Sequence, residues 1–150
     1  MPAETDLIKL YSQHILALAA DIPRVGRLDA PGGSARRRSP LCGSTVSVDV
    51  TMKDGRITDF AQEVKACALG QAAAAVVGAN AVGRTRAEIE HARDELRAML
   101  KQDGPPPGPP FDGLKVLEPA RDYKNRHASI MLSLEATLDA VDEAERAACA

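Results

Sequence analysis

The chain has 150 residues, the size of one domain with a hydrophobic core. Because it contains no tryptophan, two tyrosines and two phenylalanines, the core must be largely aliphatic. Its formal net charge of −2 gives no reason to expect nucleic acid or an anionic membrane as a partner, and no apolar run approaches the roughly 18 residues of a membrane span. The N-terminus lacks the basic and then apolar regions of a secretory signal, and the three cysteines are too widely spaced to suggest a disulfide framework. We therefore expect one cytoplasmic domain over residues 1–150.

A first helix is predicted near the N-terminus, within residues 1–22. Thr5 can cap it, and apolar residues recur at helical spacing as far as about Ala20. The segment 30–40, "APGGSARRRSP", breaks this pattern and is interpreted as an extended or mobile connection. Its three consecutive arginines, residues 36–38, are interpreted as a solvated loop or, alternatively, as a docking patch for an acidic partner.

The pattern then changes to a period of two. Apolar and polar residues alternate from Val46 to Met52, which indicates a half-buried strand. Asp54-Gly55 predicts a tight turn into a returning strand, "RITDFAQEV". We expect a small antiparallel sheet of about three strands with one solvated face.

The second half of the chain predicts helices. The alanine-rich run 67–80 is typical of a closely packed helix, and Thr85 with Glu88 fits a capping box at the start of the next one. The Pro/Gly-rich segment 103–111 cannot be a helix or a central strand and is predicted as a surface loop. A last long helix is expected over about 124–147. The fold class is therefore α+β, a small antiparallel sheet packed against several helices.

Two cysteines lie at the ends of these predicted elements. Cys67 opens a helix, whose N-terminus favours a thiolate, and Lys65 adds positive charge two residues before it. Cys42 lies in a loop in which Gly43 allows a sharp turn. Their spacing matches no compact metal motif, so packed side chains, a redox pair and a metal site all stay open. Cys149, near the C-terminus, is not expected to take part.

The histidines are the candidates that could complete a metal site. His14 and His91 lie on predicted helices and are interpreted as solvated or partly packed side chains. His127 stands at the start of the last helix in "RHASIML", where a structural role is the simpler interpretation for a lone histidine.

The order of these features resembles a known family, the U-type iron–sulfur cluster scaffold proteins (NifU-like, IscU-like and SufU-like). The resemblance is carried by "LYSQHILALAADIPRVGRL", "SPLCGS", a hairpin, "ACALGQAAAA" and "RHASIMLSLEATLDA", from about Leu7 to Val141. The long region "GRTRAEIEHARDELRAMLKQDG" makes the SufU branch the closer likeness. The resemblance implies a SufE/NifU-like fold.

The family's ligand positions carry over residue by residue. Cys42 matches the cysteine of the family's N-P-L-C-G-D loop, and Cys67 matches the cysteine at a helix start. His127 stands at the position of the third cysteine, whereas an alignment anchored on "PAR" would place Lys124 there; His127 is preferred because a protonated lysine cannot coordinate metal. Ser44 replaces the family's aspartate, which leaves the fourth ligand open.

The resemblance implies a scaffold or carrier rather than an enzyme. It would receive sulfur from a cysteine desulfurase, bind iron or a [2Fe–2S] cluster at Cys42, Cys67 and His127, and pass the cluster to acceptor proteins. One alternative is a Zn²⁺-bound sulfur acceptor that relays persulfide from the desulfurase. Another is a metal-free thiol enzyme, with Cys67 as nucleophile and His127 as base. The oligomeric state is left open.

Overall fold

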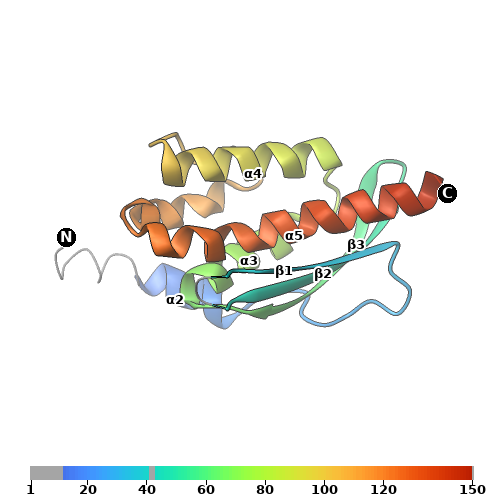
Figure 1. Cartoon of the computed structure of the whole chain (residues 1–150), viewed down its shortest axis with the longest axis horizontal. Coiled ribbons are helices and arrows are strands. Elements are labelled where there is room, and N and C mark those ends of the chain that lie inside the picture. Colours follow the sequence, from blue (N-terminus) through green and yellow to red (C-terminus); the bar gives the residue numbers. More distant parts are fainter. Residues whose placement is uncertain (1–11, 41–42, 150) are drawn as a thin grey trace.

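The computed structural model describes residues 12–40 and 43–149 (Figure 1). Within them the first helix, α2, spans Gln13–Ala20 and ends where the sequence predicted. Ser12 caps α2, because its hydroxyl accepts a hydrogen bond from the Ile15 N–H at 3.3 Å. The predicted cap, Thr5, and the loop cysteine, Cys42, lie outside the described residues.

The sheet has three antiparallel strands in the order β1-β2-β3, as the sequence predicted (Figure 1). The turn between the last two strands is the predicted one, with Asp54 at φ 54° and Gly55 at φ 78°, the pair of left-handed residues that a tight hairpin requires. The strands are β1 (Gly33–Arg38), β2 (Thr45–Lys53) and β3 (Arg56–Lys65).

The interpretation of segment 30–40 as a mere connection is wrong for its second half, which forms β1. This strand pairs with β2 along its whole length, from Gly33 opposite Val50 to Arg38 opposite Thr45. Its side chains include three arginines and no alternating apolar residues, so the period-two pattern that revealed β2 is missing from it. Gly33 lies so close to a helix that a Cβ atom there would collide with the helix backbone at Ala140.

The helices begin and end close to the predicted positions. Thr85 and Glu88 form the predicted capping box, with reciprocal hydrogen bonds of 3.2 and 3.1 Å. The Pro/Gly-rich loop 103–111 connects α4 to a 3₁₀ helix, η1, which the sequence did not predict. These elements are α3 (Ala68–Asn80), α4 (Arg86–Lys101), η1 (Asp112–Asp122) and α5 (Lys124–Cys149).

The elements form layers on one side of the sheet. Helix α5 lies across β1 and β2, α3 packs beside it, and α4 covers the outer side of α5 (Figure 1). The inward side chains of β2, among them Val46, Val48 and Val50, are buried in this core. We call this side of the sheet the covered face and the other side, which carries no described helix, the open face.

The free edge of β3 is covered by a segment that we call the strap, residues 24–28. The strap makes a parallel bridge to β3 at Gln62, whose carbonyl accepts a hydrogen bond from Gly26 at 2.8 Å. The strap also reaches over the open face to Asp49 of β2. No described helix combines the length and hydrophobicity that crossing a membrane requires.

Candidate functional site

Cys67 lies at the junction of β3 and α3. It is the N-cap residue of α3, with an extended backbone, and its side chain makes no capping hydrogen bond. The thiol is free and partly exposed. A helix N-terminus attracts negatively charged groups, and a thiol placed there can act as a nucleophile or as a metal ligand.

The register of the sheet brings the loop 39–44 to the same end as Cys67. Arg38 of β1 and Lys65 of β3 both pair with Thr45, so the β1–β2 loop and the β3–α3 junction leave the sheet side by side. The loop is closed by a hydrogen bond of 2.8 Å from the Ser39 N–H to the Ser44 carbonyl. Cys42 itself is outside the described residues, and its distance from Cys67 stays a prediction.

A chain of hydroxyl groups connects Cys67 to this loop. The Sγ atom of Cys67 lies 3.4 Å from the Oγ atom of Ser129 on α5, and Ser129 donates a hydrogen bond of 3.2 Å to the hydroxyl of Ser44. Both serines are buried. Gly70 makes this approach possible, because a Cβ atom there would lie 2.6 Å from the Ser129 hydroxyl oxygen. The three segments therefore meet around the Cys67 sulfur.

Sequence reasoning missed Ser129, although the sequence contains a signal for it. Ser129, Ser133 and Thr137 recur every four residues on α5, and all three are buried. Short hydroxyl side chains at this spacing form a stripe along one helix face, a polar line in an otherwise apolar surface.

His127 is buried at the start of α5 and faces η1. Its Nε2 atom lies 2.9 Å from the carbonyl oxygen of Ala120, so this nitrogen carries the hydrogen and the lone pair is left on Nδ1. Burial lowers the pKa of His127, and this effect outweighs the backbone hydrogen bonds at Ala120 and Arg121, while the positive charge of Lys101 lowers the pKa further. The ring is therefore neutral at pH 7, which is the form that binds metals.

His127 and Ser129 leave α5 in different directions. Residues two apart on an α-helix project about 200° from each other, and Ser129 is the one that contacts Cys67. Among residues 12–40 and 43–149, no three His, Cys, Asp or Glu side chains are close enough to share a metal ion. The predicted ligand set of Cys42, Cys67 and His127 includes a residue outside this part of the chain and stays a prediction.

The other candidates lie away from this site. Lys124, the alternative third-ligand position, is exposed at the first residue of α5. His14 is exposed on α2, and His91 is exposed on α4, where its Nε2 atom lies 3.4 Å from Glu95. Cys149 is exposed at the last residue of α5.

Comparison with known proteins identifies relatives among solved structures. No protein-family model matches the chain, and no curated protein matches it either. The chain is 45% identical to the N-terminal part of a nitrogen-fixing NifU-like protein from Brucella abortus, with a TM-score of 0.92, over 94% of this chain and 98% of that chain.

Two further structures share the fold at lower identity. One is described as an iron–sulfur cluster assembly scaffold protein of the SUF system, SufU, from Fervidobacterium islandicum (18% identity, TM-score 0.79, 89% of this chain and 98% of that chain). The other is a hypothetical protein (20% identity, TM-score 0.74, 90% of this chain and 98% of that chain). The identities favour the NifU-like protein over the SufU protein, against the expected closeness to the SufU branch.

Proposed function

Because this chain belongs to the NifU-like N-terminal family, we propose that it is a scaffold or carrier for iron–sulfur cluster assembly. The observation that supports this function best is the placement of Cys67, a partly exposed thiol at a helix N-terminus beside the loop that contains Cys42. Such a protein holds and passes on its cargo and does not turn over a substrate, so we do not assign it an enzymatic activity.

In this proposal Cys67 accepts sulfur from a cysteine desulfurase. The thiolate attacks the outer sulfur of the donor's persulfide; a new S–S bond forms at Cys67, the donor's S–S bond breaks, and the donor leaves as a thiolate. Cys67 suits this step because it is accessible and lies where α3 stabilises negative charge. Conversion of the bound sulfur to sulfide takes two electrons from an external reductant, and the completed cluster passes to acceptor proteins.

The proposed ligands for iron or a [2Fe–2S] cluster are the thiolates of Cys42 and Cys67 and the imidazole of His127. Mixed thiolate and imidazole ligation suits such clusters, and the hydrogen bond from Nε2 to Ala120 leaves Nδ1 as the ligand atom. The hydroxyl of Ser129, which contacts the Cys67 sulfur, and that of Ser44, which contacts Ser129, are poor ligands for iron. The site therefore offers few strong donors, which favours release of the cargo over permanent storage.

A zinc-bound sulfur acceptor is the second candidate, favoured by the same donor chemistry. Two thiolates and a neutral imidazole suit Zn²⁺ as well as iron, and three protein ligands leave one position open for an incoming sulfur. The metal-free thiol enzyme would require a base beside Cys67. The group within 3.4 Å of its sulfur is the hydroxyl of Ser129, while the ring of His127 is hydrogen-bonded to Ala120.

Metal analysis of anaerobically purified protein separates these candidates. After incubation with iron, cysteine, the desulfurase and an added thiol reductant, we expect iron and sulfide in the protein and a visible absorbance, which Cys67→Ser loses. Cys149→Ser is the matched control and should keep the absorbance, because Cys149 is exposed at the end of α5. A colourless zinc protein that never gains visible absorbance would contradict the scaffold function.

The role of His127 needs a variant that keeps the fold. His127→Gln retains an N–H group that can donate to the Ala120 carbonyl but has no imidazole. We expect it to keep its far-ultraviolet circular dichroism and to lose cluster more rapidly than the wild type. A cluster that is equally long-lived in His127→Gln would remove His127 from the ligand set.

A further inference from the structure

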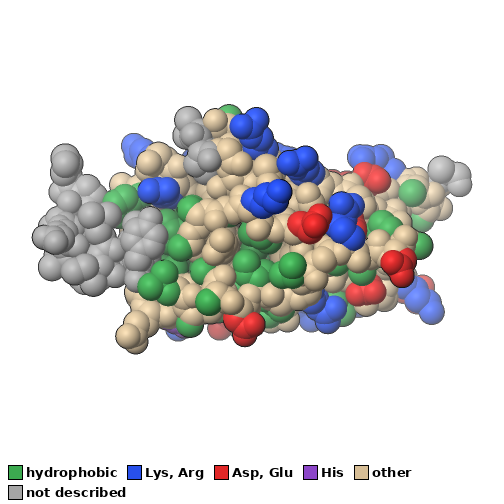
Figure 2. Space-filling model, turned by 90° about the horizontal axis from the view of Figure 1, so that it is seen from below, with side chains coloured by type: hydrophobic (Ala, Val, Ile, Leu, Met, Phe, Trp, Pro, Cys, Tyr) green, Lys and Arg blue, Asp and Glu red, His purple; other side chains and the backbone are tan. Residues whose placement is uncertain are grey.

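The open face of the sheet carries exposed cations at the end where the site lies. Arg36 and Arg38 of β1 and Lys65 of β3 are exposed and point to this face, as the alternation along each strand requires. Figure 2 shows several Lys and Arg side chains on this side of the molecule, with fewer acidic ones among them. We call Arg36, Arg38 and Lys65 the open-face cations; they stand on a chain whose net charge is −2.

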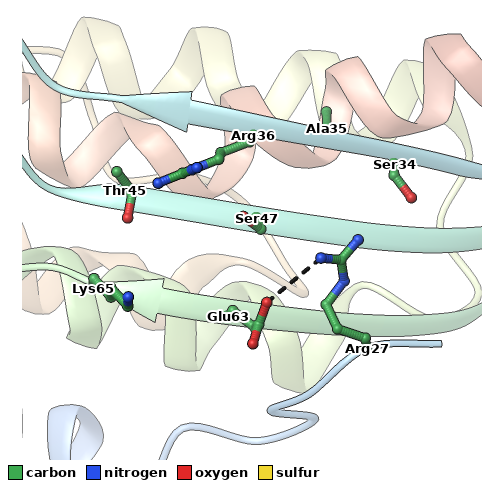
Figure 3. Close-up of a pocket in the computed structure, with 8 residues that line it drawn as sticks. All are labelled: Arg27, Ser34, Ala35, Arg36, Thr45, Ser47, Glu63 and Lys65. Atoms are coloured by element: carbon green, nitrogen blue, oxygen red, sulfur yellow. Dashed lines mark ion pairs between the residues drawn. The ribbon is translucent and has the colours of Figure 1, made fainter.

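Two of the open-face cations line a shallow hollow of about 430 Å³ on the strands (Figure 3). Arg36 lies beside Thr45 on one side of the hollow, and Lys65 lies on the other. Glu63 is the one acidic residue of the lining, and it pairs with Arg27 of the strap at 3.6 Å. The lining residues are Arg27, Ser34, Ala35, Arg36, Thr45, Ser47, Glu63 and Lys65.

The open-face cations are unpaired within the described part of the chain, where no acidic group lies within ion-pair distance of any of them. Arg37, between two of them in β1, differs: it points to the covered face and binds Asp139 of α5 at 2.6 Å. An ion pair within the chain therefore explains the presence of Arg37, but no ion pair with a described residue explains the presence of Arg36 or Arg38.

Protection of the free edge of β1 is one role that charged side chains can fill, because charge on an edge strand prevents pairing with other sheets. That role is served by either sign of charge, so it does not explain why the exposed charges at this end of both outer strands that form no ion pair with a described residue are all positive. A cluster of one sign on two non-adjacent strands, beside the partly exposed thiol of Cys67, indicates recognition of the opposite charge.

The cluster is also next to the site in sequence and in space. Arg38 is the last residue of β1 before the loop 39–44, and Lys65 is two residues before Cys67. A protein that reaches Cys67 from the covered side would meet α5 and α3, whereas the open face is not covered by any described helix. The approach from the open side brings the partner's surface over the cations.

We propose that the open-face cations dock an acidic surface of the protein that delivers sulfur to Cys67, an inference that rests on the proposed function. Charge complementarity of this kind raises the association rate and orients the encounter, and its effect weakens as salt shortens the range of the field. The docking would place the donor's persulfide at the end of the sheet from which Cys67 and the loop 39–44 emerge.

The test uses the full chain and the purified cysteine desulfurase of the same organism. The double charge reversal Arg36→Glu with Lys65→Glu changes the two open-face cations that line the hollow and leaves Arg27, which is paired with Glu63, unchanged. The control, Lys53→Glu with Arg146→Glu, makes the same change in net charge at exposed positions near the hairpin turn and the C-terminal end of α5. Lys53 is eight residues along β2 from Thr45, roughly 26 Å away at about 3.3 Å per residue.

We expect the open-face reversal to lower the association rate about 10- to 100-fold at low salt and the control to lower it less than about threefold. At about 0.5 M salt the two variants and the wild type should converge. Equal losses in both variants would overturn the docking surface and leave the proposed function intact. A wild-type chain that fails to bind the desulfurase at all would overturn both.

Discussion

The two faces of the sheet differ in what their side chains do. On the covered face the side chains of β2 and β3 pack against α5 and α3 and are buried, and the one arginine of β1 that points there is paired with Asp139. On the open face most side chains are polar, Arg36 and Arg38 form no ion pair with a described residue, and the strap covers only one part. The covered face therefore provides the stability of the fold, and the open face is free to serve recognition.

The largest effect that tests this comparison is expected for Phe60→Ala. Phe60 is 2% exposed on the covered face, opposite Val50, so its removal leaves a cavity in the core. We expect a loss of about 3–5 kcal/mol in the free energy of unfolding. Urea denaturation followed by circular dichroism measures it.

Ser47→Ala is the control on the open face. Ser47 lies on the neighbouring strand with its side chain toward solvent, and its replacement should change the free energy of unfolding by less than about 0.5 kcal/mol. If Ser47→Ala lowered the free energy of unfolding as much as Phe60→Ala, the distinction between a stabilising covered face and an open face would be contradicted.

Asp49 is an exception on the open face, and Asp49→Asn tests why. Its carboxylate is 1% exposed because the strap covers it, and it accepts hydrogen bonds from Arg27 at 2.8 and 3.0 Å, from the Leu28 N–H at 3.0 Å and from Ser34 at 2.6 Å. The variant exchanges these charge-assisted bonds for weaker ones. We expect a loss of about 1.5–3 kcal/mol at pH 7.

The effect of Asp49→Asn on the free energy of unfolding should depend on pH. Burial raises the pKa of Asp49, but the hydrogen bonds from Arg27, Ser34 and Leu28 outweigh burial and hold the pKa below its ordinary value. The ionised carboxylate therefore contributes stability above the unfolded pKa, near 4, and this contribution is lost as the pH falls through the lower folded pKa. The difference between wild type and Asp49→Asn should shrink below about pH 4, and a difference that stays constant down to pH 2 would contradict this.

Ser129→Ala tests the contact of α5 with the thiol of Cys67, which lies at one end of the sheet. The Ser129 hydroxyl lies 3.4 Å from the Cys67 sulfur, and by turning its one hydrogen from Ser44 to the sulfur it can donate to the thiolate. Removing it should slow the reaction of Cys67 with iodoacetamide at pH 7 about three- to tenfold, equivalent to about 1 kcal/mol. Mass spectrometry of the labelled peptides separates Cys67 from the other two cysteines.

Ser133→Ala is the matched control for this reaction. Ser133 lies one turn further along α5 and is equally buried, but no hydrogen bond connects it to Cys67 within the described residues. Its replacement should leave the labelling rate of Cys67 unchanged. Equal slowing in both variants would indicate a general change in the packing of α5 rather than the loss of a specific donor.

The parts of the fold that were predicted are those in which local chemistry and burial agree. Alternation from Val46 to Met52 with Asp54-Gly55 was sufficient for the hairpin, and Thr85 with Glu88 for the start of α4. β1 was missed because an arginine-rich edge strand has no apolar period, and its pairing depends on β2. η1 was missed because it contains Pro119 and a 3₁₀ helix lacks the 3.6-residue period.

The site was predictable only in part, for a similar reason. Cys67 could be placed at a helix start from its own segment, and the structure has it at the N-cap of α3. Its neighbour Ser129 is 62 residues away in the sequence, and the contact depends on how closely α5 approaches α3 at Gly70. The direction of the His127 ring likewise depends on the position of Ala120 in η1, which no local pattern determines.

The smallest effect concerns two consecutive arginines of β1 and tests the comparison most finely. Arg37 and Asp139 form an ion pair with side chains 45% and 38% exposed, so a double-mutant cycle of Arg37→Ala and Asp139→Ala should give a coupling of about 0.2–1 kcal/mol at low salt, decreasing as salt is added. The same cycle with Arg36→Ala should give a coupling near zero, because consecutive strand residues point to opposite faces. Equal couplings of Arg36 and Arg37 to Asp139 would mean that an arginine of β1 interacts with α5 whichever face of the sheet it lies on. That result would contradict the distinction between a covered face with paired charges and an open face without them.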